Sequence, residues 1–64
     1  MTLKLWETPA DNPETVTGSR EHITDWLLDY GFTPGEIRRI FGARGEEVYL
    51  AGGDWGELVA AVEA

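Results

Sequence analysis

Side chains able to perform catalysis are few in this sequence. Its single serine, Ser19, and its single histidine, His22, stand three positions apart, a spacing at which two side chains on a helix can touch. A serine nucleophile also needs its base held in line by a third group, and no carboxylate is forced into that position. With no second histidine and no cysteine, a transition-metal site is not expected either. The sequence therefore predicts a protein that acts by binding, with no catalytic residue, metal or cofactor.

Carboxylates are the abundant functional groups. Twelve acidic residues against five basic ones give a net charge of −7 over 64 residues. Glu21, Asp25 and Asp29 recur every four positions, so on a helix they form one row with roughly 6 Å between neighbours. Like charges at this spacing disfavour a helix by a few tenths of a kcal/mol per pair, and no base is placed to relieve them unless Arg20 reaches over. A row that costs stability indicates a binding role, and a merely solvated helix face is the alternative.

A second acidic stretch lies toward the C-terminus, where residues 45–64 hold five acidic residues and no basic one. Glu46 and Glu47 are adjacent on a predicted strand, so their side chains point to opposite faces. Asp54 follows Gly52 and Gly53, and its carboxylate at the start of a predicted helix opposes phosphate binding there. We therefore predict two groups of partner-binding residues: Glu21, Asp25 and Asp29, and Glu46, Glu47, Asp54 and Glu57.

The elements that carry these groups are predicted from periodicity and capping. Ser19 is a good N-cap for a helix over residues 20–30, and Gly31 can end that helix in a left-handed conformation. Its apolar face holds Ile23, Trp26, Leu27 and Tyr30. Thr33, Pro34 and Glu36 form a capping-box start for a second helix over residues 34–41, with Ile37, Ile40 and Phe41 on its apolar face.

A third helix is predicted after Gly52 and Gly53. Asp54 to Glu57 reads as another capping-box start, and Trp55, Leu58, Val59 and Val62 have the spacing of one helical face. Alternation predicts strands over residues 2–7 and 46–51, and residues 14–17 could form a short strand folding back on the first, with the turn at residues 11–13. Trp6 alternates away from the apolar side of its strand, so it either faces solvent or pairs with Tyr49 across the sheet.

These elements predict one α+β domain over residues 1–64. Its expected architecture is a small antiparallel sheet of two or three strands packed against three short helices. The N-terminus holds a single lysine and no long apolar run, so neither a signal peptide nor a membrane span is expected and a cytoplasmic location is predicted. The oligomeric state is left open.

Residues 23–41 resemble the helix-turn-helix of bacterial repressors. A glycine opens the turn, Phe32 and Thr33 follow, and Arg38 and Arg39 stand where the second helix of that family presents basic side chains. The chain departs from the family at Leu27, where a small residue is usual, and at the acidic first helix, where phosphate contacts are expected. Because DNA binders gather affinity from lysine and arginine, a DNA-binding regulator is the alternative function.

A very small, acidic, cysteine-free chain with a row of carboxylates is similar in general character to phage-borne DNA-mimic inhibitors, the anti-CRISPR and antirestriction proteins. Those proteins share no common fold, so the resemblance covers no motif. It implies an inhibitor that offers carboxylates where DNA phosphates would dock. The expected partner is a basic nucleic-acid-binding protein or complex, reached by fast, salt-sensitive association.

Overall fold

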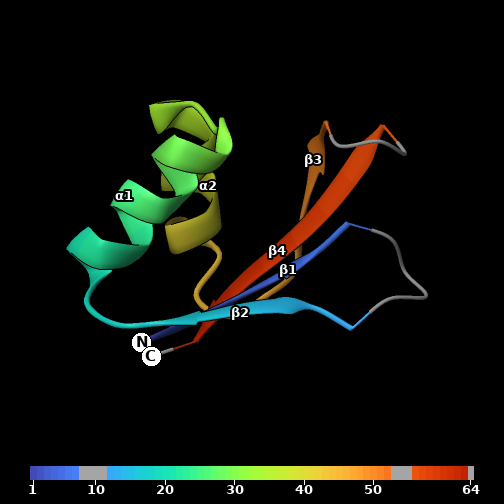
Figure 1. Cartoon of the computed structure of the whole chain (residues 1–64). Helices are drawn as coiled ribbons and strands as arrows, with labels where there is room; N and C mark the ends of the chain where they lie inside the picture. The colour runs from blue at the N-terminus through green and yellow to red at the C-terminus, as the bar shows by residue number, and fades with distance from the viewer. Residues whose placement is uncertain (8–11, 53–55, 64) are drawn as a thin grey trace.

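The computed structural model describes residues 1–7, 12–52 and 56–63. Its elements are β1 (Thr2–Trp6), β2 (Glu14–Thr17), α1 (Arg20–Tyr30), α2 (Pro34–Gly42), β3 (Val48–Ala51) and β4 (Glu57–Glu63). Figure 1 shows the two helices together on one side of the sheet, with the start of β1 beside the end of β4. The predicted α+β class is therefore confirmed.

All strand pairs are antiparallel, in the order β2-β1-β4-β3. The first and last strands form the centre of the sheet, and Thr2 lies opposite both Thr17 and Glu63. The short strand predicted over residues 14–17 is confirmed as β2, folded back on β1. The prediction of two or three strands was too low, because the sheet has four strands among the described residues.

The predicted third helix is wrong. Residues 57–63 form β4, a central strand whose middle residues Leu58 to Val62 are buried or half-buried on both faces. A short continuous apolar run suits a buried strand as well as a helix, and spacing alone does not separate the two. Asp54 and Trp55, on which the helix prediction also relied, lie outside the described residues.

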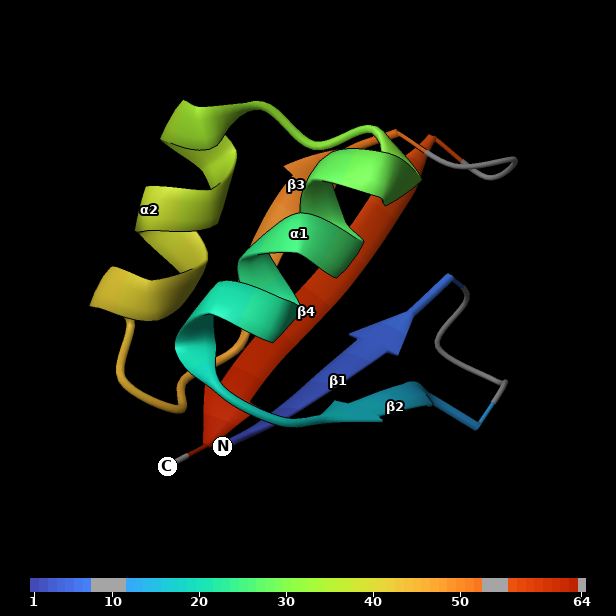
Figure 2. The same ribbon diagram turned by 60° about the vertical axis from the view of Figure 1, so that its left-hand side comes forward.

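The core lies between the helices and one face of the sheet (Figure 2). From α1, Ile23 and Leu27 are completely buried, and from α2, Ile37 and Ile40 are at most 4% exposed. They pack against the side chains of the covered sheet face, Leu3, Leu5, Val48, Leu50, Leu58, Ala60 and Val62. The predicted apolar faces of both helices are thus confirmed at these four positions.

Tyr30 was predicted on that core face, and the structure corrects this placement. Its side chain is 36% exposed and stacks between Trp26 and Phe32, with ring centroids 5.3 and 5.5 Å away. Its hydroxyl donates a hydrogen bond to Oε1 of Glu7, just beyond the end of β1. Trp26 is half-buried and packs against the core, so the stack links the exposed Tyr30 ring to the core.

The helix caps and the turn between the two helices agree with the sequence prediction. The Ser19 hydroxyl accepts a hydrogen bond from the His22 backbone N–H. Gly31 has a φ of +121°, and the backbone N–H of Phe32 bonds to the Leu27 carbonyl, as in a Schellman ending. Thr33 and Glu36 then form the predicted reciprocal capping box. The helices at residues 20–30 and 34–41 are confirmed, α2 extending one residue further to Gly42.

Candidate binding surfaces

The three carboxylates of α1 lie together on its outer side. We call Glu21, Asp25 and Asp29 the acidic row. All three are exposed, while Ile23 and Leu27 of the same helix point into the core. Among the described residues, none of the three takes part in an ion pair or a hydrogen bond through its side chain. The predicted row is therefore present as a solvent-facing line of free charge on a helix that the core holds in place.

Arg20 does not relieve this row. Its guanidinium carbon lies 4.6 Å from the ring centroid of Phe41 on α2, in a cation–π contact. The last turn of α1 carries no basic residue either, so Asp29 stands at the negative end of the helix dipole without compensation. The local arrangement leaves the row electrostatically unfavourable for folding.

The second predicted group of acidic residues does not join the row. Glu57 lies on β4 opposite Ala51, on the face of the sheet that the helices leave uncovered. Glu46 and Glu47 are exposed but precede β3, which begins at Val48, so their placement on a strand was wrong. Asp54 lies outside the described residues. Because α1 covers the opposite face, the predicted binding residues divide between two sides of the molecule.

Three residues lie side by side on the uncovered sheet face, two of them aromatic, and the sequence predicted this arrangement only in part. Val59 of β4 lies opposite Trp6 of β1 and also opposite Tyr49 of β3. Opposed residues of an antiparallel pair share a face, so Trp6 and Tyr49 flank Val59. The alternative of a direct Trp6–Tyr49 pair is therefore wrong, because Val59 stands between the two residues. The difference arose because β4 was assigned as a helix, which left no strand to stand between them.

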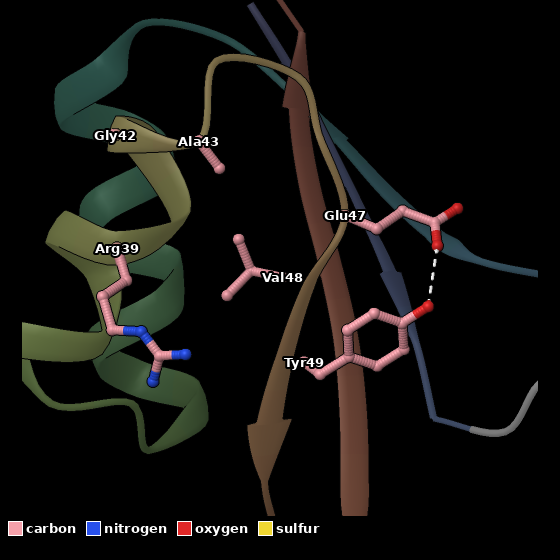
Figure 3. A pocket seen from close by; sticks show the side chains of 6 residues that line it. All are labelled: Arg39, Gly42, Ala43, Glu47, Val48 and Tyr49. Carbon is pink, nitrogen blue, oxygen red and sulfur yellow. Dashed lines mark hydrogen bonds between the residues drawn. The ribbon is translucent and has the colours of Figure 1, made fainter.

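A depression of about 220 Å³ lies over these three residues and is lined by Trp6, Glu47, Tyr49 and Val59. We call it the aromatic slot. Tyr49 is 58% exposed, and its hydroxyl donates a 3.4 Å hydrogen bond to Oε2 of Glu47 (Figure 3). The slot thus combines two aromatic rings, an aliphatic floor and one carboxylate.

The arginines in α2 and just after it do not lie on one face. Arg38 lines a depression between α1 and α2 with Leu28 and Phe41. Arg39 lines a different one with Val48 and Tyr49 of β3. In Figure 3 the Val48 side chain points toward α2 and the Tyr49 side chain points away from it. Arg44 lies beyond the helix with a φ of +52°. Arg38 and Arg39 thus line different depressions, and Arg44 stands outside α2.

Ser19 and His22, the two residues considered for catalysis, both have structural roles at the start of α1. The hydroxyl of Ser19 contacts the backbone of His22 and serves as the helix cap. The His22 ring lies against Gly18, where an added Cβ would come within 2.7 Å of its Cδ2 atom. Across the residues that the structure describes, no three histidine, aspartate or glutamate side chains converge as metal ligands would.

One titratable group is clearly perturbed. The backbone N–H and the hydroxyl of Thr33 both donate to Oε1 of Glu36, at 2.9 and 3.0 Å. These hydrogen bonds favour the charged form and lower the pKa of Glu36, with a smaller contribution from Arg39. This is the signature of a helix cap, and Glu36 lies in neither candidate surface.

Neither described helix has the length and hydropathy needed to cross a lipid bilayer. Comparison of the chain with models of protein families, with curated proteins and with solved structures found no significant match.

Proposed function

We propose that this chain is a protein-binding inhibitor whose α1 face occupies the DNA-binding surface of a basic nucleic-acid-handling protein or complex. The observation that carries the proposal is the acidic row, three exposed carboxylates in line without side-chain partners among the described residues. The row is held on a helix anchored by two completely buried side chains, Ile23 and Leu27. A helix that is already held in place loses little backbone entropy when a partner docks on it, which favours affinity.

The spacing of the row fits the surface of a DNA-binding channel in sign and scale. Neighbouring carboxylates are about 6 Å apart along the helix, whereas one strand of duplex DNA presents a charge about every 3.4 Å along its axis. The row thus supplies about half the linear charge of one DNA strand. The net charge of the whole chain, −7 with the three charges of the row included, adds long-range attraction, which speeds association with a basic partner at low ionic strength.

The test is affinity capture from a lysate with the immobilised chain at low salt, followed by elution with duplex DNA. The proposal requires that duplex DNA elutes captured proteins and that these proteins themselves bind nucleic acid. A triple variant, Glu21→Gln with Asp25→Asn and Asp29→Asn, should lose them.

A matched control separates the row from net charge. Glu14→Gln, Glu46→Gln and Glu63→Gln together change the overall charge by the same amount at exposed positions away from the row. Glu46 belongs to the second predicted group, and the proposal assigns binding to the row and not to that group. This control should keep the captured proteins. Equal losses in the two triple variants would show that net charge alone acts, and retention by the row variant would remove the row from the function.

A further inference from the structure

We propose that the aromatic slot on the uncovered sheet face binds the guanidinium group of an arginine side chain on a partner polypeptide. Three features of the slot carry this inference: two aromatic side chains lining one depression, a carboxylate lining the same depression, and access from solvent. The slot lies on the side of the sheet opposite α1, so it is a second site and does not depend on the acidic row.

The strand register sets the width of the slot. Trp6 and Tyr49 stand on β1 and β3 with β4 between them. Two inter-strand spacings amount to about 9.6 Å. A cation midway between the two side chains would be about 5 Å from each ring, inside the roughly 6 Å over which a cation and an aromatic ring attract each other. Val59 forms an apolar floor that the aliphatic stem of the ligand can cover.

The carboxylate decides between cationic ligands. Glu47 lines the same depression and accepts the Tyr49 hydroxyl hydrogen bond at 3.4 Å, which places its Oε2 beside the ring. A guanidinium is planar, stacks on aromatic rings and presents two parallel N–H donors to a carboxylate, whereas an ammonium is a compact, strongly hydrated charge. A slot lined by two aromatic rings and a carboxylate therefore favours arginine over lysine.

The charges around the slot agree with a cationic ligand. Lys4 is the one basic residue on the described strands, on the same face as Trp6 and two positions before it. It forms no ion pair or cation–π contact with a described residue, so Lys4 occupies neither ring. Glu47 and the nearby Glu57 are negatively charged, the sign opposite to that of a guanidinium ligand. Removing the Lys4 charge should strengthen ligand binding about twofold, because a like charge is withdrawn from the neighbouring position.

The experiment is an NMR titration of the whole chain with the peptide acetyl-Gly-Arg-Gly-amide at low salt, following the Trp6 indole N–H and the Tyr49 ring. Saturable shifts at both rings are expected. The citrulline peptide keeps the shape of arginine without its charge and should bind at least tenfold more weakly. Equal binding of the citrulline peptide would overturn the proposal, and tighter binding of the lysine peptide would overturn the assignment to arginine.

Paired variants assign the effect to the slot. Glu47→Gln should weaken arginine binding about fivefold, while Glu46→Gln, with the same change of charge next to it, should leave binding within twofold. Tyr49→Phe keeps the ring and should also bind within twofold, whereas Tyr49→Leu should weaken binding about threefold. Equal effects of the two glutamine variants, or of the two tyrosine variants, would overturn the proposal. Dispersed amide spectra would show that each variant is folded.

The acidic-row triple variant distinguishes this site from the proposed function. It should bind the arginine peptide as the parent does, apart from the small loss that follows the change in net charge. If it loses the captured DNA-binding proteins and keeps the peptide, the two surfaces act independently. If peptide binding falls in the row variant but not in Glu47→Gln, the arginine binds to α1 and the slot proposal fails.

Discussion

The outer side of α1 and the uncovered face of the sheet present different kinds of surface. The acidic row is a line of exposed charge without side-chain partners in the described part of the chain. The aromatic slot is a shallow apolar depression between two rings, with a carboxylate at its margin. Charge acts over distances of a Debye length, about 10 Å at 0.1 M salt, whereas ring contacts require close fit. The row is therefore suited to steering a partner and the slot to recognising one side chain.

The two surfaces also differ in what supports them. The row exists only while α1 is docked on the sheet, whereas the slot is built on three paired strands. Destabilising the helical layer should consequently disturb the row before the slot.

The largest effect is expected from the anchor of α1. Leu27 is completely buried, whereas its neighbour Leu28 is 45% exposed. Leu27→Ala should lower the free energy of unfolding by about 2–5 kcal/mol because it leaves a cavity under the helix, while Leu28→Ala should change it by about 0.5 kcal/mol or less. Urea denaturation followed by tryptophan fluorescence measures both. Similar losses in the two variants would mean that α1 is not anchored as the structure shows.

The next effect concerns the turn that sets α2 against α1. Gly31 has a φ of +121° and open space where a Cβ would lie, so Gly31→Ala should cost about 1–3 kcal/mol through backbone strain alone. Gly42, in α2, also has open space around it but no positive φ. Gly42→Ala should therefore raise the free energy of unfolding by about 0.4–1 kcal/mol. Opposite signs for the two substitutions, measured by urea denaturation, are the expected result.

These two regions also show what the sequence could predict. Residues 19–42 carry signals that act within a few positions, such as the Ser19 cap, Gly31 and the Thr33–Glu36 capping box, and both helices form there. The apolar spacing of residues 57–63 carries no such local signal, because the same spacing fits one face of a helix and a buried strand equally well. The outcome is set by pairing with β1, more than fifty positions away in the sequence.

The candidate surfaces follow the same division. The acidic row was predicted because four-residue spacing along one helix is a local property, and the structure places it as expected. The slot needs residues from β1, β3 and β4 in register. A pair of Trp6 with Tyr49 across the sheet was one of the two alternatives for Trp6, but Val59 was assigned to a helix, so the three residues could not be placed together. Glu46 and Glu47 were grouped with Glu57 by charge alone, which gives no information on position.

A smaller effect is expected at the cap of α2. Thr33→Ala removes a hydroxyl that accepts the Glu36 backbone N–H at 3.2 Å and should lower the free energy of unfolding by about 1 kcal/mol. Since hydrogen bonds from Thr33 lower the pKa of Glu36, the ionised carboxylate stabilises the fold above its ordinary pKa. This contribution is lost as the pH falls through the lowered pKa of the folded state.

The pH dependence gives the control for this cap. The difference in stability between the parent and Glu36→Gln should be largest above the ordinary pKa of 4.5 and should shrink at lower pH. Denaturation curves between pH 3 and pH 7 measure it. A difference that grows on acidification would contradict the assigned direction of the shift.

The smallest effect tests whether the acidic row is a burden on the fold. Asp25 belongs to both i, i+4 pairs of the row, so Asp25→Asn removes both repulsions without altering either end of α1. Each like-charge pair costs about 0.2–0.5 kcal/mol, and aspartate and asparagine have similar helix propensities. The free energy of unfolding should therefore rise by about 0.4–1 kcal/mol at low salt and by less at 1 M salt, where the Debye length is about 3 Å. Glu46→Gln makes the same change in net charge outside any helix and should produce a smaller gain. Equal gains would mean that the whole molecule repels itself and the row adds nothing. In that case the cost of the row would no longer support a binding role, and only its exposure and alignment would remain in favour of one.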